Sequence, residues 1–176
     1  AAGGIYDQLG GGFSRYSVDE EWLAPHFEKM LYDNGQLINL YSNTYKVTKN
    51  PEYKRIVEET VAFAERELLD DAGAYYSSLD ADSEGEEGKF YVWSQTEVDS
   101  LITNPNHAKI FSEYYTIKSG GNWENTNILY VTDDAEKILY NNKINHAQLD
   151  EILQRYHPIL MAHRDTRVRP GMDDKV

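Results

Sequence analysis

Cysteine is absent from this chain of 176 residues, so no disulfide, thiolate zinc site or dithiol redox pair can form within it. Basic residues are also scarce, because 17 Lys and Arg face 30 Asp and Glu, which gives a net charge of −13. A charge of this size repels nucleic-acid phosphates and anionic lipid. We therefore expect a small-molecule partner and neither nucleic acid nor a membrane.

Long apolar runs are missing too. None approaches the roughly 20 residues needed to span a bilayer, and no signal-peptide pattern opens the chain. Together with the absence of cysteine, this favours a cytoplasmic location. Tyrosine, in contrast, is abundant, with 14 Tyr beside 5 Phe and 3 Trp. A tyrosine ring suits the wall of a wet cleft and the edge of a core equally, so both interpretations stay open.

The length predicts one domain. The chain begins Ala-Ala-Gly-Gly without an initiator Met and ends without a closing helix. We therefore expect residues 1–176 to be a fragment of one domain in a longer protein. Apolar faces that normally pack on missing parts would then favour self-association.

Three long helices are predicted from apolar residues at helical spacing, over 26–47, 51–69 and 146–164. Pro25 suits a first helical turn, and an Asn-Pro pair begins the second helix. The short connection between the first two helices predicts an antiparallel pair. A kink or break is expected near Tyr156, because Pro158 follows inside the third helix.

Two segments rich in aromatic and small residues, 74–79 and 88–93, predict short strands. The acidic loop between them, 80–87, would form the tip of a hairpin. The predicted fold is therefore mainly α with a small β-hairpin insertion.

A first group of candidate catalytic residues lies at the start of the first predicted helix. At 100° per residue, His26, Lys29 and Asp33 share one face, and Glu28 lies in the first turn. A histidine beside carboxylates can perform acid–base chemistry. A solvated stripe of charges is the alternative.

The acidic loop forms a second group, with Asp80, Asp82 and Glu84 in the pattern of a half calcium loop. The glutamate that should complete such a loop is replaced by Tyr91, so an EF-hand is excluded. A loosely bound calcium or magnesium ion stays open. Two other interpretations of the loop also stay open. Two of its carboxylates could act as acid and base on a sugar, or the loop could be a hairpin tip whose charge keeps it soluble.

A third group is formed by Arg164, Arg167 and Arg169 near the end of the chain. These side chains could bind a carboxylate or phosphate, or neutralise the acidic loop within the fold. We favour the structural role.

Four strings together closely resemble the family of thioredoxin-domain-containing proteins that are similar to spermatogenesis-associated protein 20. They are GIYDQLGGGFSRYS at 4–17, PHFEKMLYDN at 25–34, DADSEGEEGKFYVW at 80–93 and RVRPGMDDK at 167–175. The resemblance implies a thioredoxin-like domain that this chain lacks. It also implies a helical region similar to six-hairpin glycosidases and N-acylglucosamine 2-epimerases. The chain would be part of such an (α/α)6 toroid.

The resemblance implies a carbohydrate-active region, glycoside hydrolase-like or sugar epimerase-like, with a sugar-like ligand. A non-catalytic helical binding module beside a redox domain is the alternative. On that analogy the catalytic candidates are His26, Glu28, Asp33, Asp80, Asp82 and Glu84, and the substrate-binding candidates are Tyr6, Asp7, Arg15, Tyr16, Trp22 and Trp93. No resident cofactor or metal ligand is assigned. We expect His26 and Glu28 to meet Asp80 and Asp82 in one cleft, together with Tyr16 and Trp93.

Overall fold

The computed structural model describes residues 1–132 and 134–173, so the last two residues of the fourth resembling string lie outside it. Its helices are α1 (Leu31–Thr48), α2 (Pro51–Glu67), α3 (Gln95–Leu101), α4 (Pro105–Tyr114), α5 (Ala135–Asn142) and α6 (His146–Arg164). Its strands have two residues each: β1 (Tyr16–Ser17), β2 (Pro25–His26), β3 (Lys29–Met30), β4 (Ser78–Leu79), β5 (Asp82–Ser83), β6 (Glu86–Glu87) and β7 (Met172–Asp173). The fold is mainly α, as predicted. Within the described ranges, no helix has the length and apolarity to cross a membrane.

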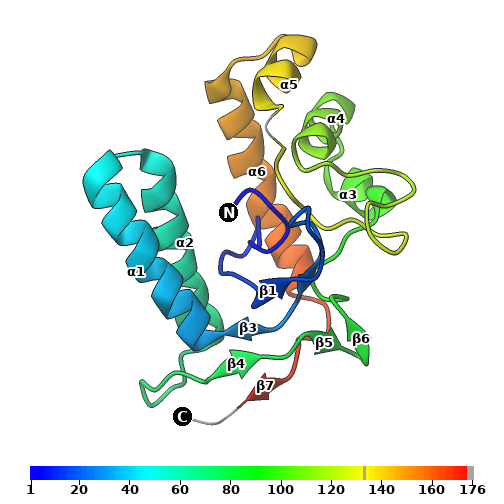
Figure 1. Cartoon of the computed structure of the whole chain (residues 1–176). Coiled ribbons are helices and arrows are strands. Elements are labelled where there is room, and N and C mark those ends of the chain that lie inside the picture. Colours follow the sequence, from blue (N-terminus) through cyan, green and yellow to red (C-terminus); the bar gives the residue numbers. More distant parts are fainter. Residues whose placement is uncertain (133, 174–176) are drawn as a thin grey trace.

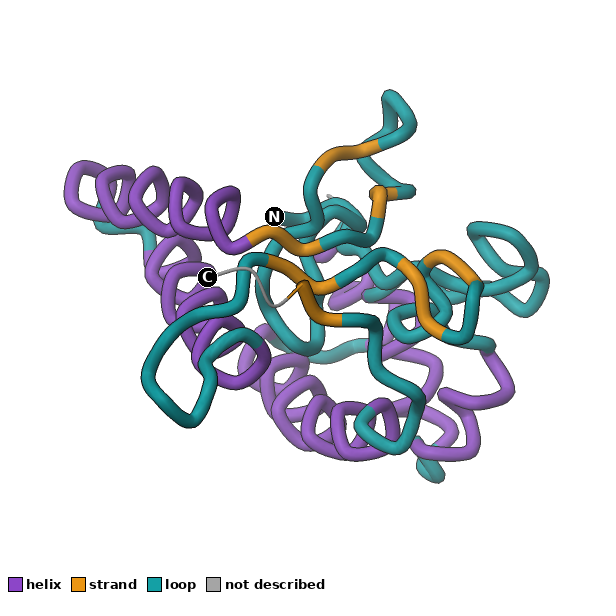
Figure 2. The backbone as a smooth tube through the Cα atoms, turned by 90° about the horizontal axis from the view of Figure 1, so that it is seen from below, coloured by secondary structure: helices purple, strands orange, loops and turns teal. Residues whose placement is uncertain are grey.

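The helices form two groups, with the short strands and loops between them (Figures 1 and 2). The α1–α2 hairpin is one group, and α3 to α6 are the other. The N-terminal segment lies between the groups and contacts both. The amino group of Ala1 donates a hydrogen bond to the Tyr41 hydroxyl on α1, and the Asp7 carboxylate pairs with Arg164 on α6.

The predicted antiparallel helix pair is confirmed. Asn50 caps α2 by accepting a hydrogen bond from the Glu52 amide, and Pro51 occupies the first turn. Two apolar side chains of α1 stay exposed among polar ones, Leu40 at 59% and Val47 at 86%. The expectation that further protein packs on exposed apolar faces stays a prediction.

The largest hydrophobic core lies in the second group and not between α1 and α2. Helix α6 supplies Leu149, Ile152, Tyr156 and Leu160 to it. This helix begins with an Asn145 capping box and runs unbroken through Pro158. The predicted break near Tyr156 is therefore wrong. Only Asn34 is fully buried on α1, which explains why that hairpin contributes less to the core.

The prediction that a helix begins at Pro25 is wrong, because residues 25–30 are extended. His26 pairs with Tyr16 across β1 and β2, and Lys29 pairs with Leu79 across β3 and β4. Burial alternates along the segment, with Pro25, Phe27 and Lys29 buried and the residues between them less so. Consequently His26 and Lys29 do not share a helix face with Asp33, and Glu28 does not lie in a helical turn.

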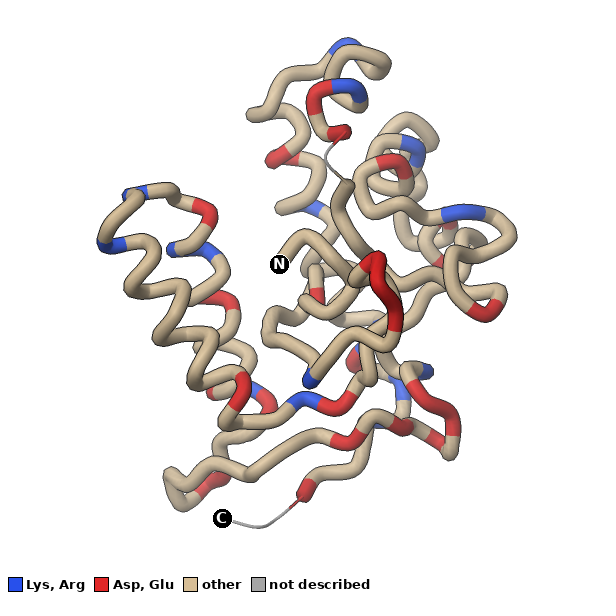
Figure 3. The backbone as a smooth tube through the Cα atoms, viewed as in Figure 1, with Lys and Arg blue, Asp and Glu red and all other residues tan. Residues whose placement is uncertain are grey.

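The predicted pairing of 74–79 with 88–93 is also wrong. Strand β4 lies between β3 and β7 instead, so segments far apart in the sequence contribute to one three-stranded sheet. The acidic loop forms its own small hairpin, β5–β6. Its turn residues Glu84 and Gly85 have φ of 55° and 77°, as in a type I′ turn. Acidic residues lie along the whole length of this hairpin (Figure 3).

Candidate functional site

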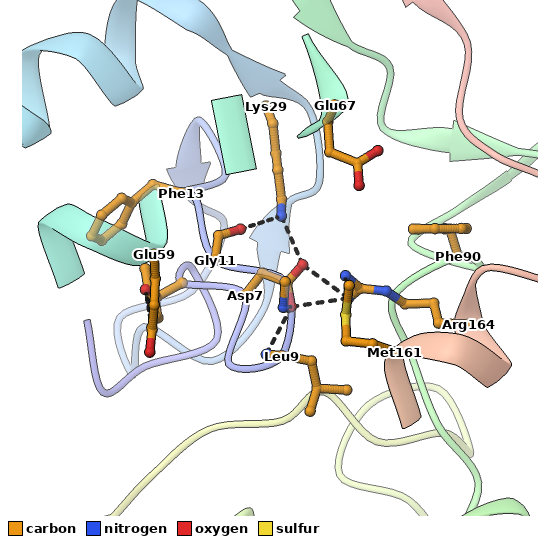
Figure 4. Close-up of polar contacts among 12 residues, drawn as sticks. Asp7, Leu9, Gly11, Phe13, Lys29, Glu59, Glu67, Phe90, Met161 and Arg164 are labelled. Carbon is orange, nitrogen blue, oxygen red and sulfur yellow. Dashed lines mark hydrogen bonds and ion pairs between the residues drawn. The ribbon is translucent and has the colours of Figure 1, made fainter. Parts of the chain in front are cut away.

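The most deeply buried charged residues of the described chain meet around Asp7, which the sequence placed among the substrate-binding candidates. Its Oδ1 accepts hydrogen bonds from the amides of Leu9 and Gly10, at 3.1 and 2.9 Å. Its Oδ2 lies 2.9 Å from the ammonium of Lys29, and both oxygens lie 2.9 Å from Nη1 of Arg164. These contacts join the N-terminal segment, β3 and α6 (Figure 4).

The Asp7 carboxylate is fixed in its charged form. Burial by itself would raise the pKa of Asp7, but Arg164 and Lys29 hold that pKa well below its usual range. A carboxylate that never takes up a proton near neutral pH cannot serve as a general acid. Asp7 therefore positions the two cations.

Lys29 is the second member of this cluster, and its side chain is 2% exposed. Its ammonium also donates a hydrogen bond to the Gly11 carbonyl at 3.0 Å. It lies 4.6 Å from the ring centre of Phe63 and 4.7 Å from that of Tyr91. Burial lowers the pKa of Lys29 to about 8, although Asp7 acts in the opposite direction.

Arg164, at the last turn of α6, is the third member and is 3% exposed. Its Nη1 holds Asp7, whereas the acceptor of its Nη2 among the described residues is the thioether of Met161, at 3.2 Å. Its Nε has no partner among the described residues. The guanidinium carbon lies 5.2 Å from the ring centre of Phe90.

The glycine-rich loop after Asp7 is shaped by this cluster. A Cβ at Gly10 would lie 2.1 Å from Nη2 of Arg164, so a side chain there would displace the guanidinium. Gly12 has φ of 80°, and a Cβ there would lie 2.4 Å from the ring of Phe63. The loop needs glycine because charged and aromatic groups pack directly against its backbone.

A pocket of about 270 Å³ opens beside the cluster. Its polar lining residues are Asp7, Lys29, Arg66, Glu67, Arg164 and Arg169, and its apolar ones include Phe63, Leu69, Leu79, Phe90 and Tyr91. Arg66 bonds Glu67 at 2.7 Å, and Arg169 also pairs with Glu67. Aromatic walls with a few convergent polar groups are typical of small-molecule sites.

His26 belongs to a second, more exposed group. Its Nδ1 lies 2.7 Å from Glu87 Oε1, and its Nε2 lies 4.0 Å from Glu28 Oε2. The Tyr16 ring stacks on the imidazole at 5.1 Å, and Arg15 pairs with Glu28 at 3.0 Å. The structure therefore brings His26, Glu28 and Tyr16 together with the acidic hairpin, as expected, but through Glu87.

The other acidic candidates do not join His26 among the described residues. Asp80 and Asp82 are exposed, and the Asp80 amide donates to the Gly171 carbonyl. Glu84 lies 3.3 Å from Lys89. Asp33 lies in the first turn of α1, and burial raises its pKa. No hydrogen bond or ion pair of His26 among the described residues involves Asp80 or Asp82, so the shared cleft with these two carboxylates stays a prediction.

Three aromatic candidates lie in different surroundings. Tyr6 is fully buried and donates a hydrogen bond to Glu59 at 2.6 Å. Trp93 is 1% exposed, beneath the guanidinium of Arg167 at 4.1 Å. Trp22 is 58% exposed. None of the three lines the 270 Å³ pocket.

No cluster of three His, Asp or Glu in the described ranges could hold a metal ion. In the acidic hairpin, Glu84 and Glu86 are both paired with Lys89. The open calcium or magnesium interpretation thus gains no support from the geometry.

Sequence reasoning missed Lys29 and Arg164 as members of one site. The signal for Lys29 is its place two residues after Phe27 in an alternating segment. The signal for Arg164 is its place four residues after Leu160, on the buried face of α6. Neither signal identifies the shared partner, Asp7, because that contact joins residues 157 apart.

No family model matches the chain. An uncharacterised protein of Caenorhabditis elegans is 32% identical over 200 residues, which cover 100% of this chain and 27% of that protein. Human spermatogenesis-associated protein 20 is 36% identical over 136 residues, or 69% of this chain and 17% of that protein. The mouse protein of that name is 40% identical over 111 residues, which cover 60% of this chain and 14% of that protein. The chain thus spans about a quarter or less of the length of these relatives.

Proposed function

We propose that this chain supplies the binding site for a small, polar, sugar-like molecule within a larger helical protein. The pocket between α2 and α6 supports this proposal, because three aromatic rings and six charged side chains line it together. Aromatic rings pack against the apolar faces of a sugar ring, and charged groups bind its hydroxyls. The α1–α2 hairpin is the repeating unit expected of a partial (α/α)6 toroid.

The size of the pocket favours a single sugar unit. Its volume of about 270 Å³ falls just below the usual lower end for drug-sized ligands, roughly 300 Å³. A monosaccharide-sized molecule suits this space better than an oligosaccharide. If the chain is not catalytic, we propose that it binds this molecule as a helical module beside a redox domain of the longer protein.

Catalysis on such a sugar is the second candidate, and the contacts of His26 favour it. A partly exposed imidazole between Glu28 and Glu87 is equipped to move a proton. In this second proposal Glu28 and Glu87 orient the ring, and Tyr16 packs on it.

The binding proposal is tested by metabolite enrichment. The full-length protein is purified from cell extract, and bound small molecules are identified by mass spectrometry. In Leu69→Trp, an indole enters the pocket, so a molecule enriched on the native protein should disappear. Leu40→Trp on exposed α1 is the matched control. Equal enrichment on all three proteins, or none on any, would sink the binding proposal.

A further inference from the structure

The charge of the pocket is opposite to that of the chain. The chain carries −13, yet the pocket is lined by four cationic side chains and only two carboxylates. The cations are Lys29, Arg66, Arg164 and Arg169, and the carboxylates are Asp7 and Glu67. Asp165, which pairs with Arg169 at 2.9 Å, lies outside the lining. A positive pocket in an acidic protein attracts and selects anions.

The donors of Arg164 are not fully used. A guanidinium has five N–H donors and no acceptor. In Arg164 the Nη1 donors hold Asp7, one Nη2 donor has only the sulfur of Met161, and Nε has no partner among the described residues. Buried donors of native proteins are nearly always paired. Arg164, which is 3% exposed and lines the pocket, therefore has donor capacity that the described residues do not use.

A second guanidinium reaches the same wall. The guanidinium carbons of Arg164 and Arg169 lie 5.2 and 5.8 Å from the ring centre of Phe90. Arg169 is 48% exposed, so it stands at the rim, whereas Arg164 lies at the base. The planar fork of a guanidinium matches the paired oxygens of a carboxylate or phosphate.

We propose that the pocket binds an anionic sugar-like molecule, whose carboxylate or phosphate accepts hydrogen bonds from Arg164 and pairs with Arg169. This inference rests on the binding function proposed above and adds the chemical class of the molecule. The Asp7 charge does not oppose it, because Lys29 and Arg164 both pair with that carboxylate.

The test compares three probes on the full-length protein by isothermal titration calorimetry. They are glucuronate for the carboxylate, glucose 6-phosphate for the phosphate, and glucose as the neutral control. At least one anionic probe should bind about tenfold or more tightly than glucose, since a charge-assisted contact contributes at least that much. The preferred probe distinguishes the two anionic groups.

Arg169→Gln should weaken the better anionic probe about tenfold and leave glucose unchanged. Arg155→Gln is the matched control, because it also removes one cation of an i,i+4 ion pair, on the exposed side of α6. Its affinities should stay within twofold of the native protein. Salt should weaken binding of the anionic probe in the native protein.

Equal affinity for glucose and the anionic probes, or no binding of either anion, would overturn the inference. An equal loss of affinity for the anionic probe in Arg169→Gln and Arg155→Gln would also overturn it. The proposed binding function fails separately, in the Leu69→Trp enrichment experiment. A neutral metabolite enriched there would leave the binding function standing and refute only the anionic class.

Discussion

Replacing Asp7 by Asn tests the buried charge cluster. The change keeps the shape of the side chain but leaves Lys29 and Arg164, which are 1% and 3% exposed, without their shared counter-charge. Breaking a buried ion pair by removing one partner destabilises a protein by about 3–5 kcal/mol. At about 2–4 °C per kcal/mol for a protein of this size, the melting temperature should fall by about 6–20 °C.

Urea unfolding followed by circular dichroism gives the free energy, and a thermal scan gives the melting temperature. Asp71→Asn, in an exposed turn, is the matched control and should change stability by less than about 0.5 kcal/mol. Should Asp7→Asn also stay within about 1 kcal/mol of the native protein, the argument from buried charge is wrong.

Lys29→Met provides a second measurement on the same cluster. It removes the surplus positive charge and keeps the Asp7–Arg164 pair, so its cost should be less than half that of Asp7→Asn. In the double variant the two costs should not add, because the side chains are in direct contact. A greater cost for Lys29→Met than for Asp7→Asn would refute the charge account.

The remaining predictions concern one titration and three packing positions. Burial lowers the pKa of His157 from 6.5 to about 4. As the pH falls from about 6.5 to 4, the unfolded chain therefore takes up a proton that the native state does not, and stability should drop by up to about 3 kcal/mol. His157→Gln should flatten that part of the pH–stability curve, and an unchanged curve would exclude this histidine as its cause. Asn34, fully buried on α1, accepts a hydrogen bond from the Phe13 amide and donates to the carbonyls of Phe13 and Met30, so Asn34→Ala should destabilise by about 2–4 kcal/mol in urea titrations. Gly12→Ala should destabilise by about 2 kcal/mol or more, because of its φ of 80° and the Phe63 ring. Gly35→Ala, whose Cβ would meet nothing within 4 Å, should stabilise α1 by about 0.5–1 kcal/mol; equal effects of the two glycine changes on the melting temperature would contradict the packing argument.

Helices whose caps and periodicity agree could be predicted from the sequence. The second predicted helix begins at Pro51 as expected, because Asn50 caps it. Helix α6 begins after the Asn145 capping box and ends at Arg164, as predicted. In both cases the signals are local, so no distant contact was needed to read them.

The segment 25–30 shows why local signals fail elsewhere. Pro25 and the following charges are typical of a helix start, yet the segment pairs with residues 16 and 79 instead. Backbone hydrogen bonds to distant strands outweighed a weak helical preference. Because residues 25–30 are extended and not helical, Lys29 lies at the centre of the molecule and not on the predicted charged surface.

In the site, too, the residues with local sequence signals could be predicted and the contacts between distant segments could not. The sequence identified Asp7, and it paired His26 with the acidic hairpin, because each lies in a motif rich in polar and glycine residues. It did not place Arg164 beside Asp7, since that contact depends on how α6 packs against the N-terminal segment. The partner that His26 takes is Glu87, the cross-strand neighbour of Asp82 in the β5–β6 hairpin, and only the pairing of those two strands shows that the two residues are neighbours.

The central claim is that the pocket at Arg164 binds an anionic sugar-like molecule, and a crystal structure of the full-length protein with glucuronate tests it most directly. The account predicts electron density for the sugar between α2 and α6. A carboxylate oxygen should lie about 2.7–2.9 Å from a guanidinium nitrogen of Arg164. Glucuronate bound beside His26 with the Arg164 pocket free of it, or bound in the pocket with its carboxylate turned away from Arg164, would contradict the account.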